Sequence, residues 1–277
     1  MGLLLRKSNF SAGYFKSNRA VQFRKFTAMK ILGIIPARYA STRFPAKALA
    51  DINGKSMIQR VVEQARQSLS LNRVVVATDD ERIYEHVSAF GGEVVMTGTH
   101  HQSGTDRCQE ALSLVGESFD YVVNIQGDEP FIQPRQIDLL TSVLDGTTEL
   151  ATLVKAITDP QTLFNPNSPK VVVSQTGEAL YFSRQPIPFQ RDRSPEEWLR
   201  PDDGPAYYKH IGLYAYRTDI LAQITQLPPS SLERAEALEQ LRWLENGYRI
   251  RVVETDLESY GIDTPEDLLQ VTVNSEQ

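Results

Sequence analysis

The chain has 277 residues, is 41% hydrophobic and carries a formal net charge of −6 at pH 7. This length and hydrophobic content suit one α/β domain with a full core, and no apolar stretch approaches the roughly 18 residues that cross a bilayer. The single cysteine, Cys108, excludes an internal disulfide and is typical of a reducing compartment, so we expect a cytoplasmic protein.

Residues 1–28 differ in composition from the rest of the chain. They hold six Lys or Arg and no Asp or Glu, and their longest apolar run is too short for the core of a signal peptide. They slightly resemble a transit peptide, but we favour a disordered tail or a start assigned too early, with Met29 as the real start. Without them the chain has 23 basic and 35 acidic residues, a net charge of −12. This balance argues against nucleic acid or an anionic membrane as a partner.

A basic loop follows the first predicted strand. The apolar run at 31–35 predicts a buried strand, which a proline ends. The loop behind it holds Arg38, Arg43 and Lys47, and no acid occurs before Asp51. Guanidinium forks and a mobile ammonium suit the oxygens of a polyphosphate, although a solvated basic loop is the plainer alternative.

Strands and helices then alternate along the chain. The pattern predicts strands over 73–77, 93–96 and 121–125 and helices from 56 and over 81–90. This rhythm is typical of right-handed βαβ units in a mostly parallel sheet with helices on both faces. A G-x-G-x-x-G string is absent, and Gly54-Lys55-Ser56 lacks the rest of a P-loop, so neither of those phosphate sites is expected.

Two polar strings stand in the loops of this region. In H-Q-S-G-T-D-R at 101–107, Ser103 and Gly104 are expected to open a helix whose free amides suit a base carbonyl or a phosphate. The neighbours His100 and His101 offer too few ligands for a metal ion.

The second string, Q-G-D-E-P at 126–130, follows the strand predicted over 121–125. Ligands of open α/β sheets gather at the carboxyl ends of strands. Gly127 allows the backbone to turn, so Asp128 can point toward the basic loop. Alternatively, Asp128 only caps the helix that follows.

From about residue 151 the pattern changes. A hairpin over 170–174 and 179–182 and a Pro-rich stretch to 205 are typical of an insertion at about 165–205. The aromatic strand predicted over 207–216 places His210 and Tyr214 on one face, where His210 could equally be a core histidine.

The last third predicts one helix, one strand and a final helix. The helix over 232–244, preceded by Ser231, should bury an apolar stripe made of Leu232, Ala235, Leu238, Leu241 and Leu244. A strand is predicted over 249–254. In the string G-I-D-T-P-E-D-L at 261–268, Asp263 directly precedes a helix start.

Four of these strings, in this order, resemble the 3-deoxy-manno-octulosonate (Kdo) cytidylyltransferases, also called CMP-Kdo synthetases. They are P-A-R-Y-A-S-T-R-F-P-A-K at 36–47 and the strings at 101–107, 126–130 and 261–268. The resemblance covers about residues 30–273. Two positions depart from the family, which usually has Gly at Ala46 and Pro at Ala48. Ala46 restricts the loop backbone more than Gly would.

The resemblance implies a Rossmann-like nucleotidyltransferase fold with an inserted hairpin and loop region, typically in a homodimer. It implies transfer of CMP from CTP to the anomeric hydroxyl of Kdo, with Mg²⁺ as cofactor, yielding CMP-Kdo and pyrophosphate for lipopolysaccharide-type glycan synthesis. A cytidylyltransferase for another acidic sugar, sialic-acid-like or an amino-Kdo, is the nearer alternative. A non-catalytic nucleotide-binding regulator is the farther one.

Site residues follow from the same resemblance, read onto this sequence. Catalysis falls to Arg38, Lys47, Asp128 and Asp263, with the two aspartates as metal ligands. Nucleotide binding falls to Ala37, Arg38, Ser41, Arg43, Lys47, Thr78, Asp79, Ser103, Gly104 and Arg107. Binding of the sugar acid falls to Gln126, Arg184, His210, Tyr214, Glu239 and Gln240. For Arg184 a surface salt bridge, and for Glu239 and Gln240 an exposed helix face, are the plainer readings.

Overall fold

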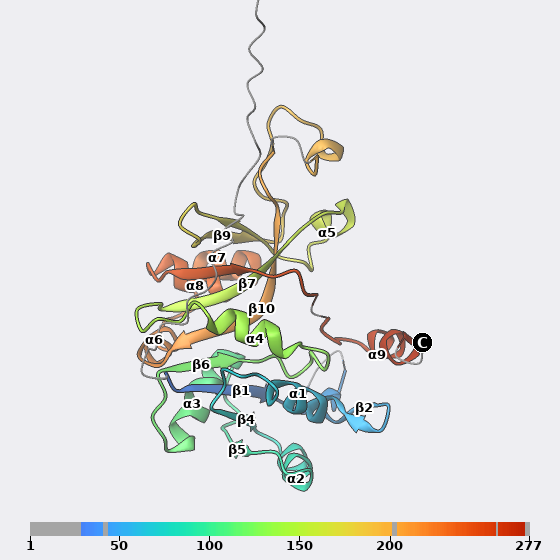
Figure 1. Ribbon diagram of the computed structural model, residues 1–277, viewed down its shortest axis with the longest axis vertical. Coiled ribbons are helices and arrows are strands. Elements are labelled where there is room, and N and C mark those ends of the chain that lie inside the picture. Colours follow the sequence, from blue (N-terminus) through green and yellow to red (C-terminus); the bar gives the residue numbers. More distant parts are fainter. Residues whose placement is uncertain (1–28, 41–43, 201–203, 259, 275–277) are drawn as a thin grey trace, which may run out of the picture.

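A computed structural model describes residues 29–40, 44–200, 204–258 and 260–274 of the chain (Figure 1). Its centre is a nine-stranded mixed sheet with the strand order β11-β7-β10-β6-β1-β4-β5, to which β8 and β9 add beside β10. Helices cover both faces, so the expected α/β architecture is confirmed. The expectation for residues 1–28 lies outside the described residues.

One half of the sheet is parallel. Its strands are β1 (Ile31–Ala37), β4 (Arg73–Thr78), β5 (Val94–Met96) and β6 (Tyr121–Asn124). The helices between them are α1 (Met57–Ala65), α2 (Glu81–Ala89) and α3 (Gly104–Val115). Strand β1 pairs with β4 on one side and β6 on the other, so its carboxyl end lies between two neighbouring strand ends.

The other half mixes directions. Its strands are β7 (Leu150–Ala156), β8 (Lys170–Val173), β9 (Ala179–Ser183), β10 (Tyr208–Arg217) and β11 (Ile250–Glu254). Strand β10 runs antiparallel to both β6 and β7, whereas β11 is parallel to β7. The helices here are α4 (Pro134–Thr141), α5 (Pro160–Phe164) and α6 (Thr218–Ile224).

Two apolar layers hold the sheet between its helices. Alternate residues of β1 supply them, with Ile31 and Ile35 in one layer and Leu32 and Ile34 in the other. Helices α1, α2 and α4 cover the first layer; α3 and α6 cover the second. Cys108 of α3 is fully buried in the second layer, consistent with a small apolar role.

The single helix predicted over 232–244 is wrong as one element. The chain forms α7 (Ser231–Glu236) and α8 (Gln240–Glu245), separated at Ala237, whose φ of 50° is left-handed. Leu232 and Ala235 of the predicted apolar stripe are exposed, because the break turns α7 away from the core that α8 joins.

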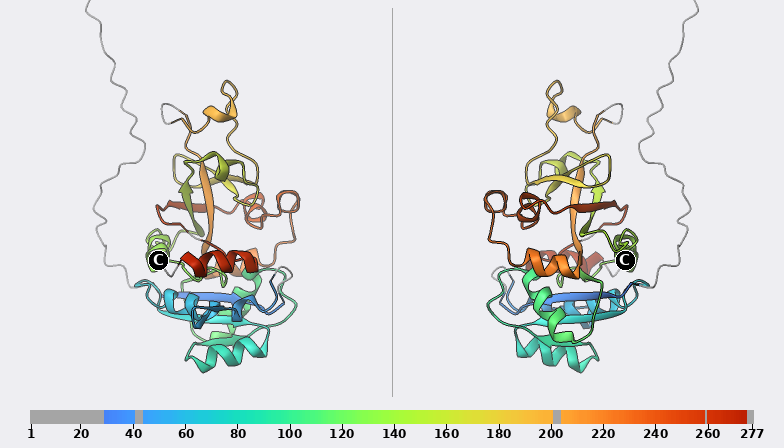
Figure 2. Two further views of the ribbon diagram at one scale, coloured as in Figure 1. Left: turned by 90° about the vertical axis from the view of Figure 1, so that its right-hand side faces the viewer. Right: turned by 90° about the vertical axis from the view of Figure 1, so that its left-hand side faces the viewer.

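An arm leaves the sheet between β9 and β10. It carries the 3-10 turn η2 (Pro195–Glu197) and projects from the body in both side views (Figure 2). At its base Ile157, Leu163, Trp198 and Tyr207 form a separate small core. The arm and the β8–β9 hairpin lie at the residues where the sequence predicts an insertion, about 165–205, and that it is an insertion stays a prediction.

Short elements complete the described chain. They are the 3-10 turn η1 (Lys47–Leu49), the ribbon β2 (Asp51–Ile52) and β3 (Lys55–Ser56), and the last helix, α9 (Pro265–Asn274). Leu268 of α9 packs on a cluster with Ile52 and Met57, so α9 lies against the start of α1 (Figure 1). No helix among the described residues is long and apolar enough to cross a membrane.

Candidate active site

Two adjoining hollows open at the carboxyl ends of β1 and β6. The first, of about 340 Å³, is lined by the cations Arg38, Lys47 and Arg107, and we call it the basic hollow. The second, of about 380 Å³, is lined by Glu129 and Glu239 among other residues, and we call it the acidic hollow. Both volumes are typical of small-molecule sites.

The two hollows share one wall. Four residues line both, namely Gly104, Gln126, Asp128 and Asp263. A ligand in one hollow therefore meets a ligand in the other beside two carboxylates.

Lys47 stands at this junction. Its Nζ lies 2.7 Å from Oδ2 of Asp128 and 3.2 Å from Oδ1 of Asp263. The three residues come from η1, the loop after β6 and the loop before α9, so the fold joins positions 81 and 216 residues apart in the chain. The prediction that Asp128 points toward the basic loop is confirmed by this contact with Lys47.

A close backbone approach sets the place of Asp128. A Cβ at Gly127 would lie 2.7 Å from the carbonyl oxygen of Pro36, so only glycine fits where the ends of β1 and β6 meet. The backbone N–H of Ile262 then donates to the carbonyl of Asp128 at 2.9 Å and brings the loop before α9 alongside.

The position of Asp263 comes from the start of α9. The Asp267 carboxylate accepts hydrogen bonds from the backbone N–H groups of Asp263 and Thr264, both at 2.9 Å. Asp267 in turn donates its own N–H to the hydroxyl of Thr264 at 3.2 Å. This reciprocal cap fixes the residue just before the helix, as the sequence predicts.

The basic hollow also faces the start of α3. Ser103 caps this helix by accepting a hydrogen bond from the N–H of Asp106 at 3.1 Å, and Gly104 is its first residue. The free amides of the first turn suit an anion. Ala37 lines the same hollow, whereas Ser41 and Arg43 lie outside the described residues.

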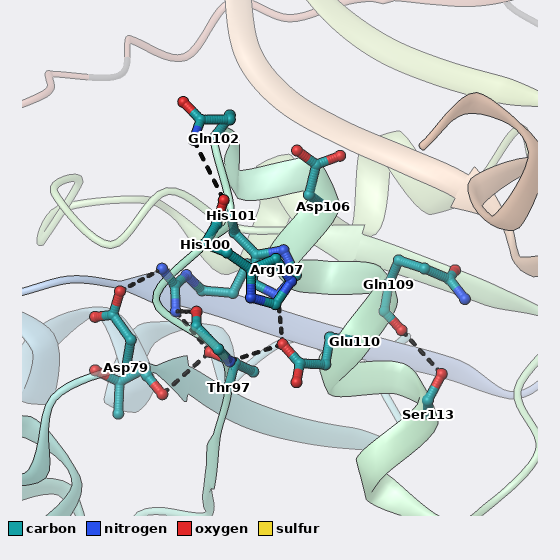
Figure 3. Close-up of polar contacts among 12 residues, drawn as sticks. Asp79, Thr97, His100, His101, Gln102, Asp106, Arg107, Gln109, Glu110 and Ser113 are labelled. Atoms are coloured by element: carbon teal, nitrogen blue, oxygen red, sulfur yellow. Dashed lines mark hydrogen bonds and ion pairs between the residues drawn. The ribbon is translucent and has the colours of Figure 1, made fainter. Parts of the chain in front are cut away.

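Arg107 is a buried anchor rather than an open cation. Only 4% of its side chain is exposed, and it donates to Asp79 at 2.7 Å and to Thr97 at 2.6 Å (Figure 3). Asp79 and Thr78, assigned to the nucleotide from the sequence, line neither hollow. Asp79 instead holds Arg107 at the edge of the basic hollow, and Thr78 is buried at the end of β4.

His101 is engaged beside this anchor. Its imidazole pairs with Glu110, which also accepts a hydrogen bond from the N–H of Gly98 at 2.8 Å (Figure 3). The pairing fastens the loop before α3 to the helix itself, so the start of α3 is held firmly.

The acidic hollow is rich in hydrogen-bond acceptors. Glu239 accepts from the hydroxyl of Thr105 at 2.8 Å, and Gln126 donates to the carbonyl of Gly212 at 3.0 Å, which fixes its amide. Tyr214 lines the hollow beside them. Among the described residues, no cluster of three or more His, Cys, Asp or Glu side chains forms a ready metal site.

Three residues assigned to the sugar acid lie elsewhere. Arg184 donates to the carbonyls of Glu236, Pro166 and Ala237 at 2.6, 3.0 and 3.1 Å. Its guanidinium therefore fastens the hairpin to the α7 end, rather than facing either hollow. Gln240 is buried and lines neither hollow.

His210 is half-buried beside two aromatic rings, those of Phe182 and Tyr214. It contacts Phe182 edge-on and shares a 3.0 Å hydrogen bond with the hydroxyl of Thr152. Burial lowers the pKa of its imidazole to about 3, so the ring is neutral at physiological pH. His210 lines neither hollow, in line with the core reading of this position.

Among the residues of the acidic hollow that sequence reasoning missed are Thr105, Asn124 and Tyr216. Thr105 stands inside the H-Q-S-G-T-D-R string, so its position was available. Asn124 and Tyr216 lie inside strands β6 and β10, and only the pairing of these strands brings them to the site.

Comparison with solved structures shows the class of protein. The 4-diphosphocytidyl-2C-methyl-D-erythritol synthase of Anaerococcus prevotii shares the fold, with a TM-score of 0.57 at 12% identity, over 90% of this chain and all of that one. A solved CMP:2-keto-3-deoxy-manno-octonic acid synthetase complexed with CTP matches with a TM-score of 0.82 and 43% identity, over 90% of this chain and 99% of that one. The fold is that of the CMP-Kdo synthetases and related nucleotidyltransferases.

Sequence comparisons give the family. Residues 32–250 match the family model described as cytidylyltransferase. The 3-deoxy-manno-octulosonate cytidylyltransferase of Cytophaga hutchinsonii is 58% identical over 248 residues, 89% of this chain and 98% of that protein. The corresponding protein of Bacteroides thetaiotaomicron is 61% identical over 244 residues, 87% and 96% of the two chains. The chain belongs to the 3-deoxy-manno-octulosonate cytidylyltransferase family, as its motifs predicted.

Proposed function

We propose that this chain transfers CMP from CTP to the anomeric hydroxyl of Kdo, releasing pyrophosphate, and so activates the sugar acid for lipopolysaccharide-type glycan synthesis. The observation that carries the proposal is the shared wall between the basic and acidic hollows. There Lys47 lies within 3.2 Å of both Asp128 and Asp263. The nucleotide and sugar would meet at this point.

The charges of the two hollows suit the two substrates. A triphosphate fits the basic hollow, where Arg38, Lys47 and the start of α3 would offset its charge. The acceptor-rich hollow around Glu239 and Gln126 suits the donor hydroxyls of a sugar. The carboxylate of Kdo is borne by its anomeric carbon, so it would arrive at the junction beside Lys47.

The two aspartates fit a Mg²⁺ ion. Both contact one ammonium nitrogen, so their carboxylates converge closely enough to share a cation. Mg²⁺ is bound by one or two carboxylates together with phosphate oxygens and water, and when bound it lowers the pKa of a hydroxyl and offsets phosphate charge. Asp128 and Asp263 would hold it, while Lys47 would stabilise negative charge on the departing pyrophosphate.

Product analysis with a panel of sugar acids tests the function. We expect CTP and Kdo to give CMP-Kdo and pyrophosphate in equal amounts. EDTA should abolish the reaction, and Mg²⁺ should restore it. A larger rate with a sialic acid or an amino-Kdo would support the nearer alternative, and nucleotide binding without any product would support a regulator.

We propose a homodimer formed through the arm between β9 and β10. Phe189 on the arm is 73% exposed and packs edge-on against Trp198 at 5.3 Å. Such exposed aromatic residues are enriched at interfaces. Light scattering should give twice the chain mass, and Phe189→Asp should shift it toward the monomer.

The free, buried Cys108 fits a reaction that takes place in the cytoplasm.

A further inference from the structure

Thr105 lies between the two hollows. It follows Ser103 and Gly104, which line the basic hollow, and it lines the acidic hollow itself. The side chain is 2% exposed. Its Oγ1 donates a hydrogen bond of 2.8 Å to Oε2 of Glu239, across from α3 to the residue before α8.

A second hydroxyl supports Thr105 from the sheet. The Tyr216 hydroxyl of β10 lies 3.4 Å from Oγ1 of Thr105 and accepts a hydrogen bond from Nδ2 of Asn124 at 3.3 Å. An ionised carboxylate can only accept hydrogen bonds, so the Thr105 hydroxyl donates its single proton to Glu239. It can then only accept a hydrogen bond from the Tyr216 hydroxyl. Each group therefore donates to the next: Asn124 of β6 to Tyr216 of β10, Tyr216 to Thr105 of α3, and Thr105 to Glu239.

The surroundings of Glu239 make this donor important. Burial raises the pKa of its carboxyl, and the hydrogen bonds of Thr105 and Ser103 oppose that rise. The ionisable groups facing it are Arg242, Asp106, Cys108, Tyr214 and Tyr216.

Arg242, the cation that faces Glu239, already pairs with another carboxylate. The guanidinium of Arg242 binds both oxygens of Glu233, at 2.5 and 2.8 Å. Asp106 adds a like charge on the side of α3, which raises the pKa of Glu239 further. Neutral hydroxyl donors thus carry most of the stabilisation of the Glu239 carboxylate.

We propose that Thr105 is a positioning residue for the sugar acid: its hydroxyl holds Glu239 as an oriented carboxylate that accepts a hydrogen bond from a hydroxyl of the bound sugar. The inference rests on the proposed function and adds a residue to it. Because Thr105 belongs to the first turn of α3, the same turn serves the nucleotide through its amides and the sugar through this side chain.

A pair of matched variants tests the inference. Thr105→Val keeps the shape but removes the hydroxyl, whereas Thr105→Ser keeps the hydroxyl. With the wild type as reference for CMP-Kdo formation, Thr105→Val should lower kcat/KM for Kdo roughly 10- to 100-fold, the loss expected when a charged acceptor loses its donor. Its KM for CTP should stay within about twofold, and Thr105→Ser should stay within about threefold of wild type throughout.

The pH profile separates positioning from a structural defect. Without its donor Glu239 should have a higher pKa, so the acidic limb of kcat/KM for Kdo should move up by about one pH unit in Thr105→Val. In a Glu239→Gln background the same change should have almost no further effect, because Thr105 acts through Glu239.

Two results would overturn the inference while leaving the proposed function intact. One is wild-type kcat/KM for Kdo and an unmoved acidic limb in Thr105→Val. The other is an effect that adds fully to that of Glu239→Gln. If Thr105→Val does not fold, Thr105→Ala removes the same hydroxyl without adding a methyl group and carries the same expectations. A wild-type chain that makes no CMP-Kdo would instead overturn the proposed function, and the inference with it.

Discussion

The ammonium of Lys47 lies where two carboxylates converge. Since Asp128 and Asp263 both contact it, Lys47 and a divalent cation would compete for the same pair of aspartates. A bound metal would displace the ammonium toward the basic hollow, where phosphate charge would attract it. The Lys47 ammonium can thus offset the negative charge of the aspartates before the substrates bind and that of the pyrophosphate afterwards.

Lys47→Ala should separate these two roles. We expect kcat to fall roughly 10²- to 10³-fold, the usual scale for one preorganised charge donor. The KM for CTP should change much less, because Arg38 and the metal still hold the triphosphate. Without nucleotide, Mn²⁺ should bind the variant more tightly than the wild type, as seen by electron paramagnetic resonance.

Lys55→Ala is the matched control for this prediction. Lys55 is exposed on β3, pairs with Glu63 at 2.7 Å and lines neither hollow, so its loss should change neither property. A Lys47→Ala variant with normal kcat and a raised KM would reduce Lys47 to a tether for CTP.

Ala46, just before Lys47, has a strained backbone. Its φ of 58° and ψ of 19° are left-handed, a conformation that costs a residue with a Cβ about 1–2 kcal/mol. Its N–H donates to the carbonyl of Tyr39 at 3.1 Å and its carbonyl accepts from Leu49 at 2.8 Å, so the turn around it is closed by hydrogen bonds. The family's usual glycine at this position now has a physical reason.

Ala46→Gly should therefore stabilise the protein. Relief of the strain, less the added freedom of the unfolded chain, leaves a gain of up to about 1 kcal/mol, and Tm should rise by roughly 2 °C. Ala50→Gly is the control, because Ala50 has an ordinary φ of −60° and glycine there should lower Tm. A lower Tm in Ala46→Gly would show that the turn is not strained.

At the scale of elements, the break between α7 and α8 brings Glu239 to the acidic hollow. Ser230 and Glu233 cap α7 reciprocally, and the Glu233 carboxylate also binds the Arg242 guanidinium of α8. This ion pair spans the left-handed Ala237. It locks the angle between the two short helices and with it the position of Glu239.

Glu233→Gln should loosen this corner. Arg242 lowers the pKa of the Glu233 carboxyl, and the two side chains are only 11% and 15% exposed, so we expect a loss of about 1–3 kcal/mol at pH 7. A carboxyl whose pKa falls on folding stabilises above its unfolded pKa of about 4.3. This contribution disappears as pH falls through the lower folded pKa.

Thermal unfolding of both forms against pH checks the sign. The difference in Tm should be constant from about pH 8 to 5 and narrow below about pH 4. Glu85→Gln, on the exposed face of α2, should change stability by less than about 0.5 kcal/mol. A difference that persists unchanged into acid would mean that ionisation of Glu233 contributes nothing.

The sequence predicts elements better than it predicts contacts. Strands β1, β4 and β6 appear where apolar runs place them, because buried parallel strands carry a strong local signal. The loop positions of Asp128 and Asp263 were also predictable, since ligands gather at strand ends and helix starts. Local periodicity cannot show a single left-handed residue, so the break at Ala237 was missed.

The hydrogen-bond partners of individual side chains were the other feature that the sequence did not predict. Arg184 seemed a ligand of the sugar acid, yet three backbone carbonyls use its donors. Those carbonyls come from two segments, one 18 and the other 52 and 53 residues away in the chain. Such pairings depend on how the hairpin packs against α7, which no short string of residues encodes.

At the scale of the whole molecule, β10 joins the parallel half of the sheet to the other strands. It pairs antiparallel with β6 on one side and β7 on the other. Tyr214 and Tyr216 of β10 line the acidic hollow. The basic hollow therefore belongs to the parallel half, and much of the acidic hollow belongs to β10 and the corner between α7 and α8.

Residues 1–28 lie outside the described residues, and the sequence predicts that they are dispensable for turnover. Relatives match 98% and 96% of their own length with only 89% and 87% of this chain, which supports a family domain shorter than the full sequence. A chain that begins at Met29 should melt within about 1 °C of the full chain and turn over equally fast. A Tm lower by several degrees would show that the tail packs on the domain.

We propose that the anomeric oxygen of Kdo attacks the α-phosphorus of CTP at the junction of the two hollows. Mass spectrometry after a single turnover tests it most directly, with Kdo carrying ¹⁸O at the anomeric position. We expect CMP-Kdo to retain the label between sugar and phosphorus and pyrophosphate to carry none. Unlabelled CMP-Kdo, labelled pyrophosphate, or hydrolysis of CTP without CMP-Kdo would contradict it.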